Sequence, residues 1–107
     1  MRADLIRGHL DMLVLTVVSG GPSHGYAIVE EMRRRSGGEF ELREGTLYPA
    51  LYRLEGEGLL ASEWKQAGGR RRRVYRLTRA GRRALEAKER DWFALVQAVG
   101  RVIGGPA

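Results

Sequence analysis

The sequence contains no cysteine and only two histidines, His9 and His24. The missing cysteines exclude disulfides, thiolate metal sites and cysteine catalysis in this chain, and two isolated histidines without a companion carboxylate make a poor metal site. Long apolar runs are missing too, since no stretch reaches the roughly 18 residues that a membrane-spanning helix needs. Asp4 and Asp11 interrupt the apolar N-terminal stretch, which therefore lacks the form of a signal peptide. We expect a cytoplasmic protein that binds no metal and no cofactor.

Lysine is nearly absent as well. Of the 19 basic residues only Lys65 and Lys88 are lysines, and the others are arginines. Arginine presents a planar set of donors that suits phosphates and guanine edges, although a GC-rich genome would also favour arginine codons. The net charge of +6 and the pI of about 10.5 indicate a polyanionic partner, namely DNA, RNA or an anionic membrane surface. The 107 residues fit one domain with a modest core, of the size that often gains stability by pairing.

Apolar residues recur at steps of three and four in the first half of the chain, which is the period of an amphipathic helix. The three helices that this pattern predicts cover 4–18, 24–35 and 46–57. Ser23 is the predicted N-cap of the second helix and Thr46 that of the third. Pro49 would then fall in the first turn of the third helix, where no intrahelical donor is lost.

Two stretches with strand character, residues 59–64 and 72–77, flank a turn at Gly68-Gly69 and predict a β-hairpin. Four consecutive arginines, Arg70 to Arg73, would lie at its tip. Thr78 caps a final predicted helix that runs to about Val102, and the apolar residues of that helix form one long stripe.

Three helices followed by a hairpin give the element order of a winged helix-turn-helix. We therefore predict a mainly α fold with a small β-hairpin: a DNA-binding domain at 1–77, a C-terminal dimerisation helix at 78–103 and a flexible tail at 104–107. The third helix would bury its leucine face and lay its opposite face in the major groove, while the hairpin reaches phosphates or the minor groove. No catalytic motif is present. The chain has no nucleophile–base motif, and the Gly68-Gly69 turn lacks the strand-to-helix context of a phosphate-binding loop. We therefore expect that the protein is not an enzyme.

Three motifs resemble the PadR-type transcriptional regulators. The first is His24-Gly25-Tyr26-Ala27-Ile28; the second runs from Gly45 to Glu55 (GTLYPALYRLE) and on to Gly58-Leu59; the third runs from Gly68 to Thr78 (GGRRRRVYRLT), with Gly81 after it. Together with the helix periods, the likeness spans nearly the whole chain. Val74 departs from the pattern, because an aromatic residue is frequent there in the family. The single, short final helix is similar to the compact branch of the family, which has no large C-terminal effector domain.

The resemblance implies a repressor that dimerises through its last helix, helped by the first, and that binds a roughly palindromic operator in double-stranded DNA. Some members of the family respond to phenolic acids or flat aromatic drugs, which implies a planar aromatic effector here. One alternative is a winged-helix module that docks protein partners without reading DNA. Another is non-specific binding to the chromosome or to RNA.

The predicted DNA contacts lie on the outer face of the third helix and on the hairpin. They are Thr46, Tyr48, Pro49, Tyr52, Arg53, Arg70, Arg71 and Arg72. The alternatives are that the arginine run is only a solvated turn, that the two tyrosines belong partly to the core, and that the proline only stiffens the helix. The run Arg33 to Arg35 either contacts a phosphate or only matches the helix dipole. His24 is predicted to help cap its helix, and Gly25 to allow close packing.

The apolar stripe of the last helix is the predicted dimer interface. It consists of Leu85, Trp92, Leu95, Val96, Val99 and Val102. Trp92, Phe93 and Val96 are the candidate effector-binding residues, because two indoles that face each other across a symmetry axis would form a slot for a flat guest. The alternative is that Trp92 simply fills the interface.

Overall fold

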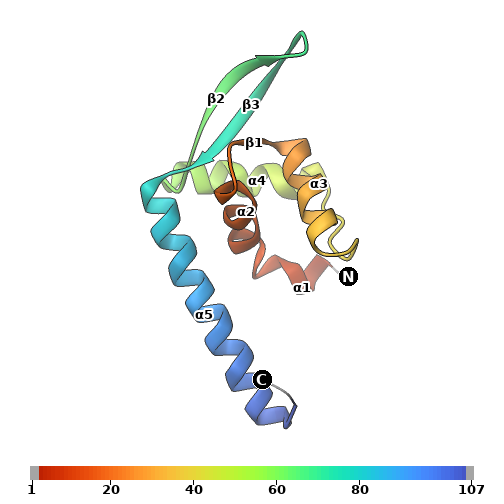
Figure 1. Cartoon of the computed structure of the whole chain (residues 1–107), viewed down its shortest axis with the longest axis vertical. Coiled ribbons are helices and arrows are strands. Elements are labelled where there is room, and N and C mark those ends of the chain that lie inside the picture. Colours follow the sequence, from red (N-terminus) through yellow and green to blue (C-terminus); the bar gives the residue numbers. More distant parts are fainter. Residues whose placement is uncertain (1–2, 106–107) are drawn as a thin grey trace.

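The computed structural model describes residues 3–105, which form five helices and one small antiparallel sheet (Figure 1). The helices are α1 (Ala3–Arg7), α2 (Leu10–Ser19), α3 (Gly25–Arg35), α4 (Glu44–Gly56) and α5 (Arg79–Ile103). The strands are β1 (Ser23–His24), β2 (Leu60–Ala67) and β3 (Arg70–Leu77). The predicted fold class, a mainly α winged helix-turn-helix followed by a C-terminal helix, is confirmed.

The first predicted helix is broken in two. Residues 4–18 were expected to form one helix, but α1 ends at Arg7 and α2 begins at Leu10. Gly8 lies at the break and is a poor helix former, and the backbone N–H of His9 donates to the carbonyl of Ile6 over 2.8 Å. Because Ile6 and Leu10 are both buried, the apolar spacing continues across the break and hides it in the sequence.

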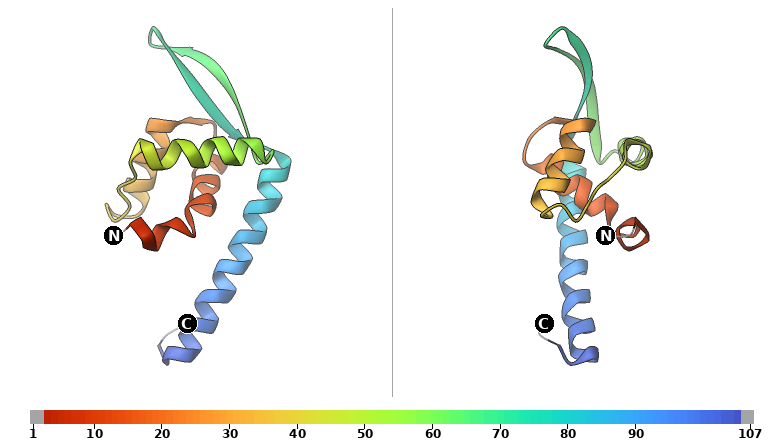
Figure 2. Two further views of the ribbon diagram at one scale, coloured as in Figure 1. Left: turned by 180° about the vertical axis from the view of Figure 1, so that it is seen from behind. Right: turned by 90° about the vertical axis from the view of Figure 1, so that its right-hand side faces the viewer.

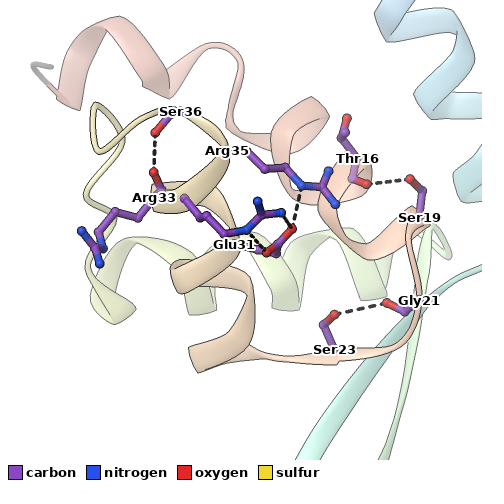
Figure 3. Close-up of polar contacts among 9 residues, drawn as sticks. Thr16, Ser19, Gly21, Ser23, Glu31, Arg33, Arg35 and Ser36 are labelled. Atoms are coloured by element: carbon purple, nitrogen blue, oxygen red, sulfur yellow. Dashed lines mark hydrogen bonds and ion pairs between the residues drawn. The ribbon is translucent and has the colours of Figure 1, made fainter.

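The sheet contains a third strand that the sequence analysis missed. β1 pairs antiparallel with β3, with Ser23 opposite Tyr75 and His24 opposite Val74, so β3 lies in the middle of the sheet. Two residues are too few to show the alternation that marks a strand. The predicted N-cap of α3 is wrong by one residue: the Ser23 hydroxyl donates to the carbonyl of Gly21 (Figure 3), and His24 is the capping residue.

The β2–β3 hairpin, called the wing below, is longer than predicted. Its strands pair from Leu60 opposite Leu77 to the residues beside the turn, so the four arginines lie along β3 rather than only at the tip. Gly68 and Gly69 have φ values of 59° and 77°. A two-residue hairpin turn of this kind needs the left-handed conformation at both positions, which glycine adopts without strain. Both views of Figure 2 show the wing projecting beyond the helices.

Helix α4 begins two residues earlier than predicted. Arg43 occupies the N-cap position and Thr46 lies inside the helix, where its N–H donates to the carbonyl of Arg43. Pro49 is therefore inside the helix and not in its first turn, so it has no N–H to donate to the carbonyl of Gly45.

The core lies where α2, α3 and α4 meet the base of the sheet. Its fully buried side chains are Val14, Leu15, Val18, Ile28, Leu47, Leu51, Leu54, Leu60 and Tyr75. The leucines of α4 were predicted to be its inner face, and all three are fully buried. Because they hold one side of α4 against the core, the opposite side of that helix faces outward.

Helix α5 leaves the body after its first turns. Thr78 caps it as predicted, since its hydroxyl oxygen accepts the N–H of Gly81 over 2.9 Å. Gly81 fits closely here, because a Cβ at this position would collide with the carbonyl oxygen of Leu59. Beyond its contact with α2 the helix extends freely (Figure 1) and ends at Gly104, whose φ is 76°.

Of the predicted tail, Pro106 and Ala107 lie outside the described residues. Gly104 and Gly105 both donate backbone hydrogen bonds to the carbonyl of Gly100 and so close the end of α5. None of the helices within residues 3–105 is long and apolar enough to cross a membrane.

Candidate nucleic-acid interface

A groove of about 590 Å³ lies between the wing, α4 and the start of α3. We call it the wing groove. Its lining consists of aromatic rings, guanidinium groups and few other side chains: His24, Gly25, Tyr26, Glu44, Tyr48, Tyr52, Trp64, Arg70, Arg71, Arg72, Arg73 and Tyr75. Aromatic rings and guanidinium groups in one concave surface suit a polyanion that also carries flat bases.

The two tyrosines of α4 face the wing groove. Tyr48 is 37% exposed and Tyr52 is 69% exposed, so both lie on the outer face of α4 as predicted. The ring of Tyr48 lies directly over Gly25, and a Cβ on that glycine would be only 2.5 Å from the hydroxyl oxygen of the tyrosine. The predicted close packing at Gly25 is therefore present, and it fixes the position of Tyr48.

Arg53 is held by an acidic partner from another helix. Its Nη1 and Nη2 donate to the two carboxylate oxygens of Asp11, each over 2.7 Å, so the guanidinium group joins α4 to α2. The hydrogen bond from Arg53 is the main reason that the pKa of Asp11 lies below its usual value. Asp11 thus holds one N–H of each terminal nitrogen of Arg53, and the DNA contact expected at this residue stays a prediction. No local sequence pattern indicates this pair, because its members are 42 residues apart.

The arginines of the wing fall into two sets on opposite faces of β3, since side chains alternate along a strand. Arg71 and Arg73 lie 5.0 and 5.4 Å from the ring centre of Trp64, which is on β2 opposite Arg73. Cation–π contacts at these distances hold the two guanidinium groups near the indole. Arg73 also lies 3.6 Å from the carboxylate of Glu55, which links the wing to the end of α4.

Trp64 was not among the predicted contacts, although the sequence contained the information to place it. With a turn at Gly68-Gly69, counting back along the hairpin puts residue 64 opposite residue 73. Trp64 is 54% exposed and lines the wing groove, so it belongs to the candidate interface.

His24 connects the start of α3 to the wing. Its Nδ1 accepts the backbone N–H of Ala27 over 3.2 Å, which is the predicted cap, and its Nε2 lies 2.7 Å from Nη1 of Arg72. Partial burial lowers the pKa of His24, and the charge of Arg72 lowers it further, so the imidazole is neutral near neutral pH.

The arginines at the end of α3 are paired within their own helix. Glu31 accepts hydrogen bonds from Arg34 over 2.8 Å and from Arg35 over 2.7 Å, and Figure 3 shows the contact with Arg35. These hydrogen bonds lower the pKa of Glu31 to about 2. Arg33 lies 3.9 Å from Glu30. This end of α3 is also remote from the wing in Figure 1. The geometry favours the interpretation of the run as ion-paired surface charge, not as a phosphate contact.

The outer part of α5 carries an exposed apolar face. The exposed large side chains are Phe93, Leu95, Val96, Val99, Val102 and Ile103. Leu85 was predicted to belong to the dimer interface. It is only 6% exposed and packs in the core of its own chain, so it is not available to a partner. Trp92 is half-buried against His9, with ring centres 4.8 Å apart and an edge-to-face geometry.

Comparison with known proteins places this arrangement in a family. Residues 14–87 match the model of the transcriptional regulator PadR-like family. The chain belongs to this family. It is 45% identical over 82 residues to the transcriptional regulator Rv3488 of Mycobacterium tuberculosis, an alignment that covers 77% of this chain and 71% of the relative. The resemblance found in the three motifs is thereby confirmed.

Two solved structures share the whole architecture. A PadR family transcriptional regulator from Eggerthella lenta is 40% identical, with a TM-score of 0.84 and coverage of 94% of this chain and 86% of the other. A transcriptional regulator from Clostridium thermocellum is 30% identical, with a TM-score of 0.86 and coverage of 94% and 96%. This member of the PadR-like family is thus a DNA-binding transcriptional regulator, as predicted, and its homologues are regulators rather than enzymes.

Proposed function

We propose that this PadR-like regulator is a dimeric repressor that binds a palindromic operator through the wing groove. The observation that carries the proposal is the meeting of two elements in that groove: Tyr48 and Tyr52 from α4, and the arginines from β3. A recognition helix that lies beside a cationic hairpin is the arrangement by which winged helix-turn-helix proteins engage a duplex.

The contacts divide into two kinds. Thr46, Tyr48, Pro49 and Tyr52 are exposed on α4 and are proposed to face base edges in the major groove. Arg70, Arg71 and Arg72 are proposed to bind phosphates, which fixes the protein on the duplex but carries no sequence information. Arg53 is left out of this set because Asp11 holds both of its terminal nitrogens.

The dimer is proposed to form along α5. This helix of 25 residues is about 37 Å long, and most of its outer half has no cover from its own chain. A symmetric pairing would bury Leu95, Val96, Val99 and Val102 of both copies at once. Trp92 would lie at the edge of this face. The wing points away from the free end of α5 (Figure 2), so the pairing would leave both wing grooves open to DNA.

Binding of a planar aromatic effector near Trp92 is proposed as a second element of the function. A cavity of about 220 Å³ beside Trp92 supports it, lined also by His9, Lys88 and Leu95. The size suits a small aromatic ring, and the charged groups of the lining are Lys88 and the carboxylates of Asp11 and Asp91. In a dimer, Phe93 and Val96 would extend this apolar surface toward the partner copy. A bound effector would change DNA affinity only if it favours one spacing of the two wing grooves over another.

Titration of fluorescent duplexes tests the proposal. One duplex carries the DNA upstream of the protein's own gene and the other a mixed sequence of equal length. We expect tighter binding to the first, and loss of that preference in Tyr52→Ala. Equal affinity for both duplexes in the wild type would contradict operator recognition, and no binding to either would favour a protein-docking module.

A further inference from the structure

The two ring nitrogens of His24 make contacts that conflict with each other. Nδ1 faces the backbone N–H of Ala27 at 3.2 Å, and an amide nitrogen can only donate, so Nδ1 must be the bare acceptor. A neutral imidazole then carries its proton on Nε2. That nitrogen lies 2.7 Å from Nη1 of Arg72, which also can only donate. Two donors therefore point at each other with no acceptor between them.

Changing the protonation state of His24 does not remove the conflict. If Nε2 were bare, it would accept from Arg72, but the proton on Nδ1 would then face the N–H of Ala27. In a doubly protonated ring both nitrogens carry a proton, so each would place a donor against a donor, that of Ala27 or that of Arg72. The cap decides between these states, because the N–H of Ala27 belongs to the first turn of α3 and has no partner inside the helix. Nε2–H and Nη1–H are thus left as a pair of convergent donors.

We propose that a phosphate oxygen of the DNA backbone is the acceptor for this pair, so that His24 is a DNA-contact residue and Arg72 its partner. A phosphate oxygen accepts several hydrogen bonds, and one oxygen can satisfy both donors. The long side chain of Arg72 has to withdraw from Nε2 to admit it. This site rests on the proposed DNA binding and adds to it a contact from β1, at the N-cap of α3, where no DNA contact was assigned.

The surroundings of His24 suit an anion. His24 and Arg72 both line the wing groove. Among the described residues, this lining contains four arginines of β3 and only one acidic residue, Glu44. The site also lies at the N-terminal end of α3, a helix of 11 residues, whose dipole favours negative charge. The pairing of His24 with Val74 fixes the distance between this helix end and the wing, and the cap fixes the plane of the ring.

The variant His24→Asn separates the two roles of the residue. Asparagine is a preferred N-cap, so its side-chain oxygen replaces Nδ1, but it is too short to place a donor at the position of Nε2. We expect the melting temperature of His24→Asn to stay at the wild-type value. We expect its affinity for a mixed-sequence duplex at low salt to fall about tenfold, because a hydrogen bond to a charged acceptor is lost.

Arg72→Ala provides the matched control. It removes a positive charge and should lower the slope of log affinity against log salt by about 1, whereas His24→Asn removes a neutral donor and should leave that slope unchanged. Because both donors serve one oxygen, the effect of His24→Asn should shrink when Arg72 is already alanine. Independent effects of the two substitutions would overturn the shared site.

The ring of His24 can also be observed directly, since the chain has only two histidines. Nitrogen-15 NMR of the wild-type protein should show the proton on Nε2 in the free state, and on duplex binding the Nε2–H signal should become protected from exchange. A bare Nε2 in either state, or wild-type affinity in His24→Asn, would overturn the site while leaving the proposed function intact. A wild-type protein that binds no duplex would overturn the proposed function itself.

Discussion

Replacing Arg53 by alanine is expected to weaken the fold and to leave DNA discrimination unchanged. The guanidinium group makes two hydrogen bonds of 2.7 Å to Asp11 and so joins α4 to α2. The Arg53 side chain is 50% exposed and that of Asp11 is 27% exposed, so water screens the pair considerably. A screened but bidentate pair is worth about 1 kcal/mol, and its loss should lower the melting temperature of a domain this small by roughly 4–8 °C.

Urea unfolding of four proteins measures this effect: the wild type, Arg53→Ala, Asp11→Asn and the double variant. The cost of Arg53→Ala should fall once Asp11 is already asparagine, because its charged partner is then missing. In duplex titrations the preference of Arg53→Ala for the upstream DNA should equal that of the wild type. If Arg53→Ala kept full stability but lost that preference, the ion pair would be incidental and Arg53 would be a base contact.

The same pair predicts how the difference changes with pH. The pKa of Asp11 in the folded protein lies below the ordinary value of 3.8, chiefly because of the hydrogen bond from Arg53. A carboxylate with a lowered folded-state pKa contributes stability above its unfolded pKa and loses it as the pH falls through the folded one. The difference in unfolding free energy between the wild type and Arg53→Ala should therefore be constant near neutral pH. It should shrink toward zero as the pH falls below 3.8. A gap that widened in acid would contradict this assignment.

Three further predictions concern the wing and α5. Arg70→Ala should weaken binding to all duplexes by similar factors and lower the salt slope by about 1, and an unchanged slope would make the wing a solvated hairpin. Val99→Asp should convert the dimer to a monomer in sedimentation at micromolar concentration and weaken DNA binding with it, whereas a monomeric wild type would contradict the α5 dimer. With Trp64 replaced by phenylalanine, planar dyes and phenolic acids should quench the fluorescence of Trp92 saturably, and the absence of saturable quenching would leave Trp92 as an ordinary packing residue.

Features with local causes were predictable from the sequence. The leucine face of α4 follows from the spacing of Leu47, Leu51 and Leu54, and the cap of α5 from Thr78 before a helical run. The hairpin follows from two glycines between strand-like stretches. In each case the residues that decide the structure are within a few positions of one another, so pattern and propensity act together.

Features with tertiary causes were not predictable in the same way. The ion pair of Arg53 joins two residues that are 42 positions apart, and β1 exists only because β3 lies beside it. Leu85 has the same apolar spacing as the exposed part of α5, and only the packing of that helix on α2 separates a core residue from an exposed one. The break at Gly8 was missed because the apolar period continues through it.

Footprinting on the DNA upstream of the protein's own gene tests the central claim most directly. A symmetric dimer with two wing grooves should protect two half-sites related by a two-fold axis, with their centres one helical turn apart, about 34 Å, or at a multiple of that distance. The wild type should protect both half-sites at the same protein concentration. At that concentration Val99→Asp should protect neither half-site. A single asymmetric protected block, or full protection by a monomeric Val99→Asp, would contradict the account.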